Sequence, residues 1–306
     1  MRIDDILATS RPVFSFEFFP PRTPEGVEAL FETIATLKPL EPSFVSVTYG
    51  AGGATREGTV EVSTTIKREH GLEAMAHLSC VGETTEGLIE ILDRLRAGGI
   101  ENVLALRGDP PRGQAHFERP KGGLDSAAEL AAFISERYEF ALGGACFPEV
   151  HPEAESLEAD LAYLKTKVTS GASFLITQLF FDNRVYFEFV EAARAIGIEV
   201  PIIPGVIPIT SYAQIVRFCE LCAASIPSPL AKAMEALNGD PRGEAELGIA
   251  YATRQCEELL AGGAPGLHFY TLNRAPATRA VLAALRAGRP RERIGAEAAP
   301  ASMGLD

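Results

Sequence analysis

The stretch Val13-Phe14-Ser15-Phe16-Glu17-Phe18-Phe19-Pro20-Pro21 places one carboxylate inside an otherwise apolar strand. Alternation along a strand puts Ser15, Glu17 and Phe19 on one face and the other phenylalanines on the opposite face. The proline pair cannot continue a hydrogen-bonded strand, so Glu17 lies near the C-terminal end of the strand. An acid at the end of a buried strand therefore needs either a chemical or a structural reason.

Two interpretations of Glu17 remain open at this point. Aromatic neighbours remove water from the carboxyl group, which favours its neutral form and makes it a candidate proton donor near neutral pH. Alternatively, the carboxylate forms an ion pair with a buried arginine or lysine and has only a structural role.

Around this stretch, apolar runs alternate with amphipathic helical patterns along the whole chain. The expected strands are 13–19, 44–49, 74–80, 102–107, 140–147, 174–180, 201–206 and 267–272. The expected helices lie near 25–38, 56–70, 84–97, 126–138, 156–170, 183–196, 211–223 and 276–287, after a short helix at the N-terminus. Such a series of βα units predicts a (β/α)8 barrel.

The predicted barrel is a single domain over residues 1–288, with extra helices within 226–263 before the last strand and a flexible tail over 289–306. The alternative fold is a doubly wound open sheet. No G-x-G-x-x-G follows the first strand, where Thr23 is a plausible helix N-cap and Pro24 the first helical residue. This junction favours the barrel.

Composition limits the function classes. The 306 residues are 46% hydrophobic and carry a formal net charge of -13, which argues against nucleic acid or an anionic membrane as partner. No apolar run reaches the roughly 18 residues of a membrane span, and the acidic N-terminus does not resemble a signal peptide. We expect a cytoplasmic protein, and we expect the CxxC of Cys219 and Cys222 to be buried thiols within a helix rather than a redox or metal site.

Unusual polar residues collect at the predicted strand ends. Because the C-terminal ends of barrel strands share one face, these residues should surround one large polar pocket. They include Glu17, Thr48, His77, Ser79, Arg107, Gly108, Asp109, the segment 147–152, Gln178 and the segment 270–274.

The residues alone leave two kinds of ligand open for this pocket, a phosphate-bearing molecule and a metal ion. The glycines at 50, 52 and 53 allow a close approach of backbone to a bulky ligand, and Lys165 and Lys167 could reach a pyrophosphate. The alternative is a metal-dependent hydrolase in which Glu149 and His151, with His77 and Asp109, bind a metal ion. The absence of a repeated ligand spacing weakens that alternative.

Six motifs together identify a resemblance. They are Phe16-Glu17-Phe18-Phe19-Pro20-Pro21, Val45-Ser46-Val47-Thr48-Tyr49-Gly50, Leu106-Arg107-Gly108-Asp109, Pro148-Glu149-Val150-His151-Pro152, Ile176-Thr177-Gln178 and His268-Phe269-Tyr270-Thr271-Leu272-Asn273-Arg274. In order and spacing, from about residue 10 to 285, the chain resembles the methylenetetrahydrofolate reductases of the short bacterial type, which consist of the catalytic barrel alone.

The resemblance implies a barrel that binds FAD non-covalently, accepts hydride from NADH or NADPH, and passes it to 5,10-methylenetetrahydrofolate in a ping-pong sequence. The product, 5-methyltetrahydrofolate, feeds methionine synthesis. Carried over by position, the implied flavin-binding residues are Thr48, His77, Arg107, Gly108, Asp109, Ala127, Phe147, His151, Ala154, Asp160 and Lys167. The implied substrate-binding residues are Asp109, Gln178, Gln214, Phe218, Leu272 and Arg274.

The resemblance also assigns catalytic roles to Glu17 and Asp109. Opening the five-membered ring of the substrate requires a proton on the departing nitrogen, which a neutral Glu17 could give. The negative charge of Asp109 would favour the cationic iminium that accepts hydride. Phe147 departs from the family pattern, in which many members carry tyrosine. We further expect a homo-oligomer with no metal ion; a non-catalytic folate-binding protein is the other alternative.

Overall fold

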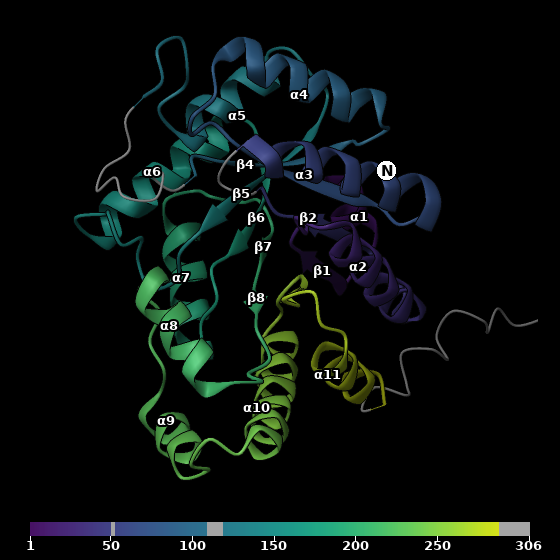
Figure 1. Ribbon diagram of the computed structural model, residues 1–306. Coiled ribbons are helices and arrows are strands. Elements are labelled where there is room, and N and C mark those ends of the chain that lie inside the picture. Colours follow the sequence, from purple (N-terminus) through teal and green to yellow (C-terminus); the bar gives the residue numbers. More distant parts are fainter. Residues whose placement is uncertain (50–52, 109–118, 288–306) are drawn as a thin grey trace, which may run out of the picture.

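The computed structural model of the protein describes residues 1–49, 53–108 and 119–287. The predictions for Gly50, Gly52 and Asp109, and for the tail from residue 289, lie outside these residues. Figure 1 shows a group of strands surrounded by helices, with α9 and α10 at the end far from α4.

A single parallel sheet forms the centre of the fold. Its strands are β1 (Val13–Phe18), β2 (Phe44–Val47), β3 (Ala74–Ser79), β4 (Asn102–Leu106), β5 (Ala141–Cys146), β6 (Ala172–Thr177), β7 (Ile202–Ile203), β8 (Gly205–Val206) and β9 (Gly266–Tyr270). Their order is β7-β6-β5-β4-β3-β2-β1-β9-β8. The pairing of β1 with both β2 and β9 places Glu17 in the middle of the sheet order, next to Ser46 on one side and Tyr270 on the other.

The sheet closes through the segment that contains β7 and β8. These short strands are separated only by Pro204, and β7 pairs with β6 while β8 pairs with β9. The carbonyl of Pro204 accepts a hydrogen bond of 2.9 Å from the backbone N–H of His268, so the proline joins the two halves. Taken as one interrupted strand, β7 and β8 complete the predicted barrel, and the doubly wound sheet is ruled out.

The helices follow the strands largely as predicted. They are α1 (Ile3–Thr9), α2 (Pro24–Leu37), α3 (Gly53–Thr65), α4 (Thr85–Ala97), α5 (Ala127–Ser135), α6 (Leu157–Thr169), α7 (Asn183–Ala195), α8 (Tyr212–Cys222), α9 (Ser228–Glu235), α10 (Pro241–Ala261) and α11 (Pro276–Ala287). The side chain of Thr23 accepts a hydrogen bond from the Gly26 N–H, which confirms the predicted cap. Helices α9 and α10 are the extra helices expected before the last strand.

Polarity changes along the inside of the barrel. At its N-terminal end the interior is apolar, with Val13, Phe44 and Phe174 packed together against Ile3 and Leu7 of α1. Burying one such side chain stabilises the fold by about 1.5–3 kcal/mol. Further along the same faces the interior becomes polar, as Ser15, Glu17, Ser46, His77 and His268 are all buried. The apolar half thus provides a rigid base for a polar site.

A second apolar cluster covers the C-terminal side of the barrel. Leu179, Phe181 and Ile207, which follow the strands, pack against Ile215 of α8 and Met234 of α9. The predicted strand 174–180 therefore ends at Thr177, since the apolar residues after it turn toward α8 instead of continuing the sheet. Within the described ranges, no helix combines the length and the apolar character needed to cross a membrane.

Candidate functional site

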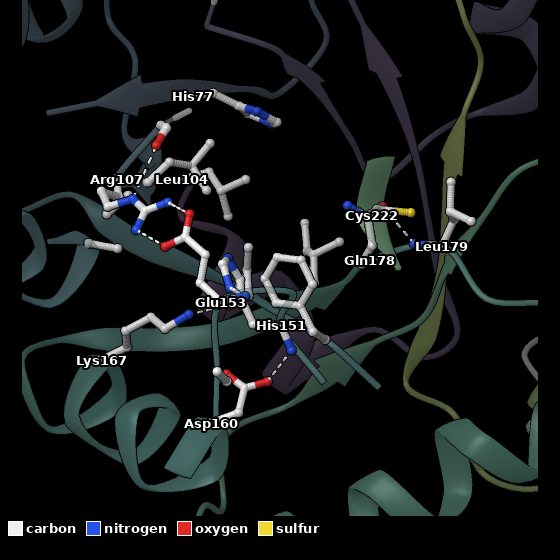
Figure 2. Close-up of a pocket in the computed structure, with 18 of the residues that line it drawn as sticks. His77, Leu104, Arg107, His151, Glu153, Asp160, Lys167, Gln178, Leu179 and Cys222 are labelled. Carbon is white, nitrogen blue, oxygen red and sulfur yellow. Dashed lines mark hydrogen bonds and ion pairs between the residues drawn. The ribbon is translucent and has the colours of Figure 1, made fainter. Parts of the chain in front are cut away.

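A cavity of about 900 Å³ opens at the C-terminal ends of the strands. This volume is near the upper end of the roughly 300–1,000 Å³ of ligand sites, and most of its lining is apolar. Figure 2 shows the cavity with charged side chains on one wall. The predicted residues that line it are Glu17, His77, Arg107, Gly108, Ala127, Phe147, His151, Ala154, Asp160, Lys167, Gln178, Phe218 and Leu272.

Other predicted residues lie elsewhere. Thr48, Gln214 and Arg274 do not line the cavity in the part of the chain that the structure describes. Thr48 follows β2, and its carbonyl accepts a hydrogen bond of 2.8 Å from Thr59. Gln214 and Arg274 are exposed, on α8 and after β9 respectively. Their binding roles stay predictions, as does the role of Asp109.

The floor of the cavity is built around Glu17, which is 7% exposed. Its Oε2 atom lies 3.3 Å from Nε2 of His268 and 3.5 Å from Nε2 of His77. On the other side of the His268 ring, Nδ1 lies 2.8 Å from Oγ of Ser15. Both ring nitrogens of His268 are thereby held, because strand pairing places Ser15 opposite His268 and Glu17 opposite Tyr270.

These contacts determine the charge of the floor. Burial by itself raises the pKa of Glu17. The hydrogen bond from His268, the proximity of His77 and a contact with Ser46 together outweigh burial, so the pKa lies below its ordinary value. Burial lowers the pKa of His77 to about 4, although Glu17 opposes the shift. The floor at neutral pH therefore contains an ionised Glu17 and a neutral His77.

This charge state corrects one expectation from the sequence. One of the two interpretations had aromatic neighbours favour a neutral Glu17, but Phe16 and Phe18 point to the helices on the outside of the barrel, where they are fully buried. The groups that face Glu17 are imidazoles and a hydroxyl instead. In the described part of the chain, the ionic partners of Glu17 are His77 and His268 and not the arginine or lysine of the alternative interpretation.

The charged wall comes from the loops after β4 and β5 and from α6. Nη1 and Nη2 of Arg107 donate to the two carboxylate oxygens of Glu153 at 2.5 and 2.8 Å. Lys167 is buried and donates to the carbonyl of Ala145 at 2.7 Å, and burial lowers its pKa although Cys146 and Asp160 oppose the shift. Lys165, by contrast, donates to the carbonyl of Gly197 and does not line the cavity.

The turn after β5 is fixed by its own hydrogen bonds. The backbone N–H of His151 donates to Asp160 at 2.9 Å, and the N–H of Glu153 donates to Nδ1 of His151 at 3.1 Å. Phe147 stacks edge-on against His151 with 4.5 Å between ring centroids. Burial lowers the pKa of His151, while Asp160 and Glu153 oppose the shift. The turn thus brings Glu153 to Arg107 in a defined position.

Gly108 is required by backbone geometry at the end of β4. Its φ angle is +90°, in the region that side chains rarely adopt. An added Cβ atom would lie 2.0 Å from Oγ of Ser79, which itself donates to the carbonyl of Arg107 at 2.7 Å. Backbone and side chain are therefore packed too closely at this edge of the cavity for any other residue.

The opposite wall is apolar and comes mainly from α8. Phe218, Leu221 and Cys222 face the cavity, and Leu221 is 74% exposed. The end of α8 is held by Glu149, whose carboxylate oxygens accept hydrogen bonds of 3.0 and 3.1 Å from the N–H of Ser225. Cys219 is buried and Cys222 half-buried, both are free thiols, and burial raises the pKa of each, so the expectation of structural thiols is supported.

The described residues contain no cluster of histidine, cysteine, aspartate and glutamate that could hold a metal ion. Glu149 accepts hydrogen bonds from Ser225, and Nδ1 of His151 accepts one from the backbone N–H of Glu153, so both side chains already have other partners. Asp109, the remaining acid of the metal-hydrolase alternative, lies outside the described residues.

Some residues of the site were not singled out from the sequence. His268 is fully buried and contacts Glu17 at the floor, and the period-two alternation that places Ser15 and Glu17 inside could have identified it. Tyr270 lines the cavity and belongs to the predicted segment 270–274. Tyr270 donates to the carbonyl of Thr177 at 2.6 Å, and burial raises its pKa well above the ordinary value. Glu153 and Leu221 carried no comparable signal, since they lie on a loop and on an exposed helix face.

Comparison with known proteins gives a consistent result. Residues 2–286 match the family model described as methylenetetrahydrofolate reductase. The 5,10-methylenetetrahydrofolate reductase of Escherichia coli is 39% identical over 267 residues, which cover 87% of this chain and 88% of that protein. Methylenetetrahydrofolate reductase (NADH) 1 of Arabidopsis thaliana is 40% identical over 283 residues, or 89% of this chain. The chain spans about half the length of the plant relatives, 48% in that case.

Solved structures share the fold at low sequence identity. An uncharacterised protein from Clostridium thermocellum that binds two copies of 5-methyl-5,6,7,8-tetrahydrofolic acid matches with a TM-score of 0.63 and 16% identity, over 93% of this chain and 97% of that one. A dihydropteroate synthase from Xanthomonas albilineans matches with a TM-score of 0.54 and 13% identity, over 92% and 94% of the two chains. These likenesses support the barrel fold.

Proposed function

This chain belongs to the methylenetetrahydrofolate reductase family, and from that premise we propose that it reduces 5,10-methylenetetrahydrofolate to 5-methyltetrahydrofolate with a nicotinamide donor and bound FAD. The observation that carries the proposal is the position of Glu17. The carboxylate of Glu17, hydrogen-bonded to His268 and flanked by His77, lies at the floor of a large cavity with one charged and one apolar wall. Reduction of a cyclic aminal needs such an acid close to an apolar binding surface.

The residues present fit a flavin dinucleotide. Arg107, His151 and Lys167 offer cationic or hydrogen-bonding groups along one wall, which suits the diphosphate. Nε2 of His77 is buried and lies 3.5 Å from Oε2 of Glu17, but it makes no hydrogen bond to any described residue, so it could bond to a flavin heteroatom placed over the floor. FAD, once bound, supplies two-electron hydride chemistry, and the protein supplies orientation and electrostatics.

The apolar wall suits the two substrates that would alternate at one place. Phe218 and Leu272 offer surface against which a nicotinamide or pterin ring could pack, and Gln178 offers an amide at the same edge. The side-chain oxygen of Gln178 accepts a hydrogen bond of 2.8 Å from the N–H of Leu179, which leaves its NH₂ group directed elsewhere. A primary amide in this position can bind the polar edge of a pterin.

The proton donor in this proposal is Glu17, assisted by its partners. Because its pKa is lowered, Glu17 needs a further influence before it can act as an acid near neutral pH. A ligand bound over the floor would remove the remaining water and favour the neutral carboxyl group. The protonated carboxyl group of Glu17 would then donate its proton to the departing nitrogen of the substrate, while His268 keeps the carboxyl group in position.

The visible spectrum of the purified protein tests the cofactor, and two half-reactions test the activity. We expect flavin absorbance that is bleached by NADH or NADPH under anaerobic conditions and restored by methylenetetrahydrofolate. A protein that binds folate but neither carries FAD nor takes it up would reject the enzyme and support a non-catalytic folate-binding protein.

A further inference from the structure

The pair of Arg107 and Glu153 is built into one wall of the cavity (Figure 2). The two guanidinium nitrogens face the two carboxylate oxygens, which is the strongest arrangement for these groups. Both residues line the cavity, and the side chain of Arg107 is 25% exposed while that of Glu153 is 55% exposed. The arginine is thus anchored at the strand end and the glutamate lies on the outer, more accessible side.

The position of Glu153 is set by the turn and not by chance contact. His151 accepts a hydrogen bond from the Glu153 N–H, and Asp160 on α6 accepts one from the His151 N–H. The carbonyl of His151 also accepts from the N–H of Ala154 at 2.8 Å. Three hydrogen bonds from backbone N–H groups therefore fix this turn, and the Glu153 side chain extends from it to the guanidinium group of Arg107.

An anionic ligand and Glu153 would compete for the guanidinium group of Arg107. Arg107 and Lys167 supply the positive charge of this wall and His151 adds an imidazole beside them, so a phosphate in the cavity gains most by approaching this wall. Glu153 meets that phosphate with a like charge and already engages the fork of Arg107. Because the Glu153 side chain is 55% exposed, water can solvate its carboxylate when the carboxylate leaves Arg107, so a ligand can displace it.

From this geometry we infer that Glu153 is an internal competitor for Arg107 that weakens the binding of a phosphate-bearing ligand to this wall. The inference rests on the proposed function, which makes the ligand the diphosphate of FAD. Glu153 sets how tightly that group is held and is not required for the chemistry. Removing its charge should strengthen binding, which is the opposite of what loss of an ordinary cavity residue does.

The test is the affinity of flavin-free protein for FAD. The protein is stripped of flavin and titrated with FAD, with quenching of flavin fluorescence as the readout. In Glu153→Gln the dissociation constant should fall about three- to tenfold, because one like charge and one competitor are removed while a hydrogen-bonding side chain remains. This increase in FAD affinity should become smaller as the salt concentration is raised.

A matched control separates the specific pair from the general charge. Glu155 lines the same cavity two positions away, so Glu155→Gln removes the same charge from the same loop. We expect that change to alter the FAD dissociation constant by less than about twofold. In an Arg107→Met background, Glu153→Gln should increase the affinity for FAD by less than it does in the wild type, because the guanidinium group for which Glu153 and FAD compete is absent.

The outcomes distinguish the inference from the proposed function. A wild-type protein that does not bind FAD would reject the cofactor assignment. If the wild type binds FAD and Glu153→Gln binds it equally or more weakly, then Glu153 orients Arg107 for the ligand and the competition is rejected. An equal gain in Glu155→Gln would likewise reject it, since the effect would come from the overall charge of the loop.

Discussion

Oε2 of Glu17 and Nε2 of His268 lie 3.3 Å apart at the floor of the cavity, although 251 positions separate the two residues in the sequence. Parallel pairing of β1 with β9 creates this contact. Ser15, opposite His268 in the same pairing, holds the other side of the ring at 2.8 Å. One strand pair therefore supplies the acid, its partner and the group that orients the partner.

Glu17→Gln keeps the volume of the side chain and removes its titratable proton. We expect FAD binding and flavin reduction by the nicotinamide donor to be retained, because that half-reaction transfers hydride without protonating a leaving nitrogen. Reoxidation by methylenetetrahydrofolate should slow by about 10²–10⁴-fold, the usual contribution of a positioned acid. Stopped-flow absorbance of the two halves measures both rates. Wild-type reoxidation in the variant would leave Glu17 with a structural role.

His268→Asn tests whether His268 acts through Glu17. Asparagine is too short to reach Glu17 but can still contact Ser15, so the hydrogen bond that lowers the pKa of Glu17 is lost. We expect the pKa seen in the folate half-reaction to rise, which moves the alkaline limb of its pH profile upward. His268→Gln, which can extend a donor toward Glu17, should restore much of the wild-type profile. A fall in rate with no shift of the profile would indicate a purely structural His268.

His77 makes the fold sensitive to acid. Its folded pKa of about 4 is below the unfolded value of 6.5, so the unfolded chain binds a proton more readily. The stabilising effect of neutral His77 is complete above pH 6.5 and is lost as the pH falls toward 4, at a cost of roughly 3 kcal/mol. The lowered pKa of Glu17 acts in the same direction, below about pH 4.5.

In His77→Gln the loss of stability between pH 6.5 and 4 should become smaller, which urea unfolding at a series of pH values would measure. His70→Gln, on the short helix 66–70 and outside the cavity, controls for the removal of an imidazole. An unchanged slope in His77→Gln would show that His77 is not buried in its neutral form.

Much of the fold could be predicted because it depends on local patterns. Apolar runs that alternate with helical stretches indicate the number of βα units. Ser15 and Glu17 lie two positions apart on one face of β1, and this alternation indicates which side chains point into the barrel. The surroundings of Glu17 could not be predicted in this way, since they come from paired strands. Phe16 and Phe18 flank Glu17 in the sequence but pack outside, whereas His77 and His268 face it across the sheet.

The walls of the cavity were harder still to predict. Arg107 was expected at the site from its place at a strand end, but Glu153, 46 positions later, is brought to it by a turn whose hydrogen bonds leave no periodic signal. Leu221 lines the cavity because the apolar cluster under α8 places that helix over the barrel. Such contacts depend on the packing of whole elements and not on the residues next to them.

Arg274→Ala tests a prediction that the geometry leaves open, because Arg274 is exposed after β9 and does not line the cavity in the described part of the chain. Its charge could still hold an anionic end of the folate that extends from the cavity mouth. A charged hydrogen bond contributes about 1.5–3 kcal/mol, and exposure favours the lower value, so KM for methylenetetrahydrofolate should rise about tenfold. Flavin reduction by the nicotinamide donor should not change.

Arg274→Lys keeps the charge but not the planar fork, and it should lose less than the alanine variant. Arg279→Ala, an exposed arginine on α11, controls for the loss of surface charge. Steady-state KM and the two half-reaction rates, measured on all three variants, decide the question. Equal damage to both half-reactions would place Arg274 in the scaffold or near the flavin, and an unchanged KM would remove it from the substrate site.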